Sequence, residues 1–142
     1  MISLRPATPA DARAIGALCA QLGYPSSEAE IRHRLEALAR SPDCEITVAD
    51  DGGAAVAFVQ VSIHRAIESG AWAEIDGLVV EESRRGQGIG AELVAHARAW
   101  AAGRGMPRLR VRTNEKRAEA HCFYERLAFT LTKSQRVYDA KP

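Results

Sequence analysis

Residues 72–91 decide the fold, and they read Trp72-Ala73-Glu74-Ile75-Asp76-Gly77-Leu78-Val79-Val80, then Glu81-Glu82-Ser83, then Arg84-Arg85-Gly86-Gln87-Gly88-Ile89-Gly90-Ala91. The apolar residues of 72–80 predict a strand. From about residue 88 to 103 the apolar residues recur at helical spacing and predict an amphipathic helix. The stretch therefore predicts a strand, a glycine-rich loop and a helix in direct succession.

The loop has the composition of an anion site. Glycines alternate at 86, 88 and 90, and without Cβ atoms the backbone turns tightly and approaches a ligand closely. The start of the following helix presents unpaired N–H groups and a partial positive charge. Arg84 and Arg85 add formal charge. Ligands of open α/β sheets bind at the carboxyl ends of strands, which is where this loop lies.

Three other interpretations of the loop fit less well. Gly86, Gly88 and Ala91 match a dinucleotide-binding fingerprint loosely, but the position about 20 residues on, where that fold places an acid, falls in Met106-Pro107. A nucleotide P-loop needs Gly-Lys-Ser/Thr, which is absent. Glycines that merely shape a turn do not account for the two neighbouring arginines. We therefore interpret the loop as a phosphate-binding loop.

Caps, turns and periodicity predict the remaining elements. Thr8 and Asp11 begin one helix, and Ser27 and Glu30 form a capping box that begins another. The predicted strands are 2–5, 44–49, 54–64, 72–80, 108–113 and 129–138, and the predicted helices are 8–22, 27–40, 88–103 and 117–127. The order is β-α-α-β-β-β-α-β-α-β. It predicts one α/β domain over residues 1–142 with a mixed sheet, antiparallel at first and then a parallel β-α-β unit.

Composition narrows the class of protein. Hydrophobic residues make up 46% and charged residues 26%, as in globular proteins. The formal net charge is +1, which argues against a nucleic-acid binder. No apolar run has the length of a membrane span, and the N-terminus does not read as a signal peptide, so we expect a cytoplasmic protein away from membranes. The odd number of cysteines and the lack of a Cys-x-x-Cys motif argue against disulfides and structural zinc.

The segment from Glu74 to Ala91 resembles the signature of the GNAT superfamily of N-acetyltransferases, Gln/Arg-x-x-Gly-x-Gly/Ala between a strand and a helix. The resemblance extends to the opening residues 4–11, to Asn114, and to His121-Cys122-Phe123-Tyr124-Glu125-Arg126-Leu127-Ala128-Phe129, which is similar to the family's Phe-Tyr segment. Nearly the whole chain fits. One departure is Ala128, where members often carry glycine, and it falls on the final turn.

The resemblance implies acetyl-coenzyme A as cofactor. Backbone N–H groups of Arg85, Gly86, Gln87, Gly88, Ile89, Gly90 and Ala91 would hold its pyrophosphate. The backbone of Leu78, Val79 and Val80 would pair with the pantetheine arm like an added strand. Asn114 would lie near that arm, and Lys116 or Arg117 near the nucleotide.

The expected reaction is attack of a neutral primary amine on the thioester in a ternary complex. By the same resemblance Tyr124 is the candidate acid. Glu74 is the candidate base, because it lies eleven positions before Arg85, as in the histone-acetylating branch, and shares a strand face with Asp76. A water relay is the alternative to Glu74. The alternative function is a non-catalytic domain that senses acetyl-coenzyme A.

We expect the acceptor to be an amine of a small molecule or peptide. The family fold implies that residues 22–34 and 64–72 form the walls of the acceptor site. Tyr24 and Trp72 are candidate flanking residues. Acids in or near these walls would attract a cationic acceptor, and they are Glu28, Glu30, Glu68, Glu74 and Asp76. No helix carries two ligands at metal spacing, so we predict no metal. The resemblance also implies a homodimer.

Overall fold

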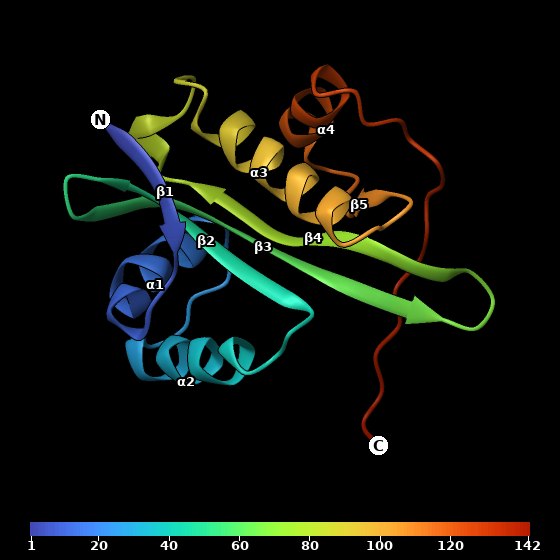
Figure 1. Cartoon of the computed structure of the whole chain (residues 1–142), viewed down its shortest axis with the longest axis horizontal. Coiled ribbons are helices and arrows are strands. Elements are labelled where there is room, and N and C mark those ends of the chain that lie inside the picture. The colour runs from blue at the N-terminus through green and yellow to red at the C-terminus, as the bar shows by residue number, and fades with distance from the viewer. The chain divides into compact units, whose positions relative to one another are not determined.

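The computed structural model describes residues 1–142, and the chain divides into two compact units, Met1–Arg112 and Thr113–Pro142. The first unit contains a five-stranded sheet, three α-helices and two short 3-10 helices (Figure 1). Its elements are β1 (Ile2–Pro6), η1 (Pro9–Asp11), α1 (Ala12–Gln21), α2 (Glu28–Ala39), β2 (Cys44–Asp51), β3 (Ala54–Ala66), β4 (Gly70–Val80), η2 (Glu82–Arg84), α3 (Ile89–Gly103) and β5 (Leu109–Val111).

The strands lie in the order β1-β2-β3-β4-β5. Neighbours from β1 to β4 pair antiparallel, and β5 pairs parallel to β4. This confirms the mixed sheet and the β-α-β unit that the sequence predicts. The turn between β2 and β3 uses Gly52 and Gly53, at φ values of 62° and 99° that glycine adopts without strain.

Helices cover both faces of the sheet. Val48 and Phe58 pack with Ile15 and Leu35 of α1 and α2 in one apolar cluster. The neighbouring residue of β2, Thr47, contacts His96 of α3 with 3.1 Å between Oγ1 and Nε2. Because alternate residues of a strand point to opposite faces, α1 and α2 lie on one face and α3 on the other. No helix of the structure has the length and apolarity that a membrane crossing requires.

Both predicted helix starts are confirmed. Ser27 Oγ accepts from the N–H of Glu30 at 3.1 Å, and the Glu30 carboxylate accepts from the N–H of Ser27 at 3.3 Å. Asp11 reaches back to the N–H of Thr8 at 2.8 Å. The first turn of that helix is 3-10, so the α-helix itself begins at Ala12.

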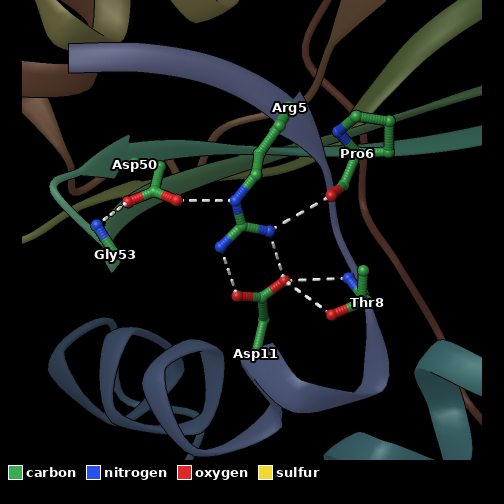
Figure 2. A network of polar contacts seen from close by, with 6 residues as sticks. All are labelled: Arg5, Pro6, Thr8, Asp11, Asp50 and Gly53. Carbon is green, nitrogen blue, oxygen red and sulfur yellow. Dashed lines mark hydrogen bonds and ion pairs between the residues drawn. The ribbon is translucent and has the colours of Figure 1, made fainter.

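Asp11 also belongs to a partly buried ionic network that joins β1 to the start of α1 and to the β2–β3 turn (Figure 2). The Arg5 guanidinium donates to both carboxylate oxygens of Asp11 at 2.9 Å and to Asp50 at 2.7 Å. Asp50 in turn accepts from the N–H of Gly53 at 2.7 Å. The hydrogen bonds from Arg5 hold the pKa values of Asp11 and Asp50 below their usual range.

The second unit contains one helix, α4 (Ala118–Arg126). It ends in a Schellman motif: the N–H of Ala128 donates to Glu125 O at 3.1 Å and that of Phe129 to Tyr124 O at 3.0 Å. This motif places Ala128 in the left-handed region, at φ 67°, where glycine fits better. The alanine at 128, where family members often carry glycine, therefore has a backbone conformation that its Cβ atom disfavours sterically.

The predicted strand at 129–138 is wrong. Those residues form no strand, and Leu131, Val137 and Tyr138 are exposed. A strand needs a neighbour with which to exchange backbone hydrogen bonds, and Thr113–Pro142 contains no other strand to supply one.

Candidate functional site

A β-bulge interrupts β4 at Asp76. Gln60 of β3 lies opposite Gly77 and the next residue, Val61, lies opposite Ile75, so Asp76 is the extra residue of β4. Bulges bend a strand and redirect a side chain, and they are common beside functional sites. This one lies where the pairing on the other side of β4 ends.

On that other side, β5 pairs only with residues 73–75 of β4. From Asp76 to Val80 no strand of Met1–Arg112 pairs with this edge. The N–H of Glu81 donates to Val56 O at 2.8 Å, so backbone groups of Glu81, and by alternation Val79, point toward β3. Those of Leu78 and Val80 point toward the open edge. An extended ligand segment added at this edge would therefore meet Leu78 and Val80, whereas the backbone of Val79 belongs to the ladder with β3.

The open edge leads directly into the glycine-rich loop. Gly86 and Gly88 have φ values of 79° and 84°, and a Cβ at either position would meet no atom within 4 Å. Gly88 is the N-cap of α3, and the first helical hydrogen bond runs from the N–H of Glu92 to Gly88 O at 3.1 Å. The N–H groups of Ile89, Gly90 and Ala91 thus precede the helical ladder and are free to meet an anion.

Side chains hold the loop in place. The N–H of Glu82 donates to Oε1 of Gln21 on α1 at 3.0 Å. Arg84 forms an ion pair of 2.8 Å with Asp51 in the β2–β3 turn. Arg85 donates from Nε to the Val80 carbonyl at 3.1 Å, on the open side of β4. The sequence predicts that both arginines lie beside a bound anion. In the structure Arg84 pairs with the carboxylate of Asp51, and Arg85 lies at the open edge of β4.

These features fit the pyrophosphate and pantetheine of coenzyme A. The loop offers bare amides with space where side chains would stand, and the open edge offers backbone groups at Leu78 and Val80. Both lie within Met1–Arg112, in one continuous run of chain.

Glu74 is buried, with 7% of its surface exposed. Its carboxylate accepts from Trp72 Nε1 at 3.1 Å and from Arg112 Nε at 3.2 Å. The candidate base is therefore fixed by two donors, one of them the cation of Arg112, which directly follows β5. Sequence reasoning did not identify Arg112, although its place two residues after Arg110 in an alternating strand was the available signal.

Sequence reasoning also missed a polar cluster on the same face of the sheet. Ser62 Oγ donates to Asp76, and His64 Nε2 lies 3.0 Å from Asp76 Oδ1 and 3.1 Å from Ser62 Oγ. Ligand atoms of His64, Glu74 and Asp76 lie within 4.8 Å of one another, a spacing that a metal ion would also accept. Each of these atoms already has a hydrogen-bond partner in the structure, so we interpret the cluster as a hydrogen-bonded network beside the bulge.

The second unit carries the other candidate residues. Tyr124 packs edge-to-face on Phe123 and Phe129, with ring centroids 5.0 and 5.4 Å away. Burial raises the pKa of its hydroxyl to about 12, so the group keeps its proton at neutral pH. Asn114 Oδ1 accepts from the N–H of Lys116 at 2.9 Å and shapes the turn before α4, and Arg117 is the N-cap of that helix.

Three of the acids expected to attract a cationic acceptor form ion pairs with arginines. Glu28 and Glu30 pair with Arg32 and Arg34 along α2, at 3.3 and 3.4 Å. Glu74 pairs with Arg112, and Asp76 is hydrogen-bonded to Ser62 and His64. Tyr24 is 70% exposed.

The acetyltransferase (GNAT) family model matches residues 12–129. The match spans most of the chain, and the protein therefore belongs to the acetyltransferase (GNAT) family. Its mixed five-stranded sheet with four α-helices is the fold of that family. No curated protein sequence matches the chain.

Solved structures share the fold. A transcriptional regulator from Bacillus halodurans C-125 is 24% identical, with 99% of this chain and 100% of that chain covered and a TM-score of 0.89. An aminoglycoside N-acetyltransferase in complex with CoA is 18% identical, with coverages of 100% and 96% and a TM-score of 0.89. Glucosamine-6-phosphate N-acetyltransferase from Arabidopsis thaliana is 20% identical, with coverages of 99% and 99% and a TM-score of 0.83.

Proposed function

We propose that the protein transfers the acetyl group of acetyl-CoA to a primary amine, by direct attack of the amine in a ternary complex. The observation that carries the proposal is the open edge of β4, which begins at a bulge and leads into a loop of bare amides. Membership of the GNAT family supports it. Two of the similar structures are N-acetyltransferases by name, and one of them holds CoA.

In this proposal the N–H groups of residues 85–91 hold the pyrophosphate, and the backbone of Leu78 and Val80 pairs with the pantetheine arm. Asn114 and Arg117 remain candidate contacts through the family resemblance. Acetyl-CoA supplies a thioester whose carbonyl carbon accepts the amine. The N–H of Leu78 points toward the open edge two residues after the bulge, and we assign it the role of stabilising the negative charge that develops on the carbonyl oxygen.

The amine must lose a proton to react, and Glu74 is the proposed acceptor of that proton. Its carboxylate offers about four lone-pair positions, and the two donors Trp72 and Arg112 leave room for another. We propose that a water occupies this place and carries the proton from the amine to Glu74. This combines the two routes that the sequence left open.

Tyr124 is the proposed acid toward the leaving thiolate. A hydroxyl with a pKa of about 12 is protonated throughout the physiological range, as a donor must be. Its packing between two aromatic rings restrains its side chain.

The test is release of thiol from acetyl-CoA in the presence of a panel of amines: aminoglycosides, polyamines, amino sugars, amino acids and peptides. Calorimetry on the same protein measures acetyl-CoA binding. Release that depends on an amine supports the enzyme. Binding without release across the panel favours the sensor, and absence of binding contradicts both functions.

A further inference from the structure

Two arginines lie over the ring of one tryptophan, Trp72 of β4. The guanidinium carbons of Arg108 and Arg110 lie 5.3 and 5.0 Å from the centroid of the Trp72 ring. The His64 ring stacks on Trp72 as well, with centroids 5.8 Å apart and 15° between the planes. Trp72 is only 8% exposed, so these groups rest on a buried, fixed support.

The strand register places both arginines on the same face as the cluster at the bulge. The N–H of Ala73 donates to Arg108 O at 3.1 Å, and Arg110 lies opposite Glu74. Alternate residues of a strand share a face, so Arg108 and Arg110 project beside Trp72 and Glu74. Asp76 is two residues beyond Glu74, which is roughly 7 Å along the strand.

The arginines on this face of the sheet outnumber the carboxylates that neutralise them. Arg112 is paired with Glu74, and Asp76 is occupied by Ser62 and His64. No carboxylate of Met1–Arg112 forms an ion pair with Arg108 or Arg110. Two guanidinium groups on alternate residues repel each other, and an anion between them would relieve that repulsion.

The stacking also leaves the arginines suited to bind an anion. A guanidinium that lies over an aromatic ring still has N–H donors, and those donors match the oxygens of a carboxylate or phosphate. Ordering on the ring removes part of the side-chain entropy that binding would otherwise cost. A polycationic acceptor would meet here two guanidinium groups that no carboxylate of Met1–Arg112 neutralises.

We propose that the amine acceptor carries an anionic group, a carboxylate or a phosphate, which Arg108 and Arg110 bind while the amine lies near Asp76. The inference rests on the proposed acetyl transfer for the identity of the amine. The separation of the two ends, roughly 7–13 Å along the strands, suits an amino-sugar phosphate or a short amino acid derivative rather than an extended polyamine.

The test compares acceptors that differ only in the anion: glucosamine 6-phosphate with glucosamine, and triglycine with triglycinamide. Calorimetry measures their binding to the CoA-saturated protein, and thiol release measures their turnover. We expect the anionic member of at least one pair to bind at least tenfold more tightly. The variant R108Q/R110Q should bring the two members of that pair to within twofold of each other.

The matched control is R13Q/R40Q, which removes the same charge from two exposed residues outside the expected acceptor walls and should leave the preference intact. Equal binding within both pairs by the unaltered protein, or a preference that survives in R108Q/R110Q, overturns the inference, and the first of these outcomes does not depend on the variant folding. Failure of the proposed acetyl transfer has a different signature, which is binding of an acceptor without release of thiol from acetyl-CoA in the presence of any amine.

Discussion

A charge placed at Gly88 tests the cofactor assignment most directly. Gly88 is exposed, has a φ of 84°, and its absent Cβ faces open space where the pyrophosphate would lie. At an effective dielectric of about 20, one carboxylate roughly 6 Å from one phosphate charge costs about 3 kcal/mol. Exposure to solvent and salt reduces this cost. We expect Gly88→Glu to weaken acetyl-CoA binding at least tenfold, which corresponds to about 1.4 kcal/mol.

Two further variants separate charge from backbone strain. Gly88→Gln has the same shape without the charge, and Gly105→Glu carries the charge at a residue with a similar φ of 72°, after the end of α3. Each substitution forces a side chain into the left-handed region at about 1–2 kcal/mol of stability. Calorimetry at low and high salt should show the large loss only for Gly88→Glu, and most strongly at low salt. Equal affinity of the glutamate and glutamine variants at Gly88, or an equal loss at Gly105, would refute the reasoning.

Three other predictions concern single residues. Tyr124→Phe should lower kcat more than it changes acetyl-CoA affinity, and an undiminished kcat would remove Tyr124 as the acid. Ala128→Gly should stabilise the protein by about 1 kcal/mol in urea unfolding, because the residue has a φ of 67°, and a lower midpoint would contradict the strain. Arg5→Met should destabilise by about 3 kcal/mol near neutral pH, because it leaves the buried Asp11 carboxylate without its cation. Since Arg5 depresses the folded-state pKa of Asp11, its contribution is present above about pH 4 and is lost as the pH falls through that folded value, so unfolding curves of the two proteins should converge in acid.

Local signals account for the parts of the fold that the sequence predicted well. The capping boxes at Thr8 and Ser27 satisfy amides within one turn of the chain, and the glycines at 52 and 53 set a turn by their own φ values. The strand, loop and helix at 72–103 need only neighbouring residues to be recognised. The last strand failed for the opposite reason, since its residues required a pairing partner that no local pattern reports.

The sequence by itself determined the glycine-rich loop and its place between a strand and a helix, because these features lie within one short stretch, and it predicts phosphate binding there. The alternation of side chains along a strand also implies that Arg108, Arg110 and Arg112 share a face, although sequence reasoning assigned no role to these three arginines. Only the tertiary structure decided what that face contains. The bulge at Asp76 and the parallel pairing of β5 bring Ser62 and His64 from β3, Trp72 and Glu74 from β4, and the three arginines together. Which of these charges neutralise one another depends on distances between strands, and a sequence does not specify those distances until the chain has folded.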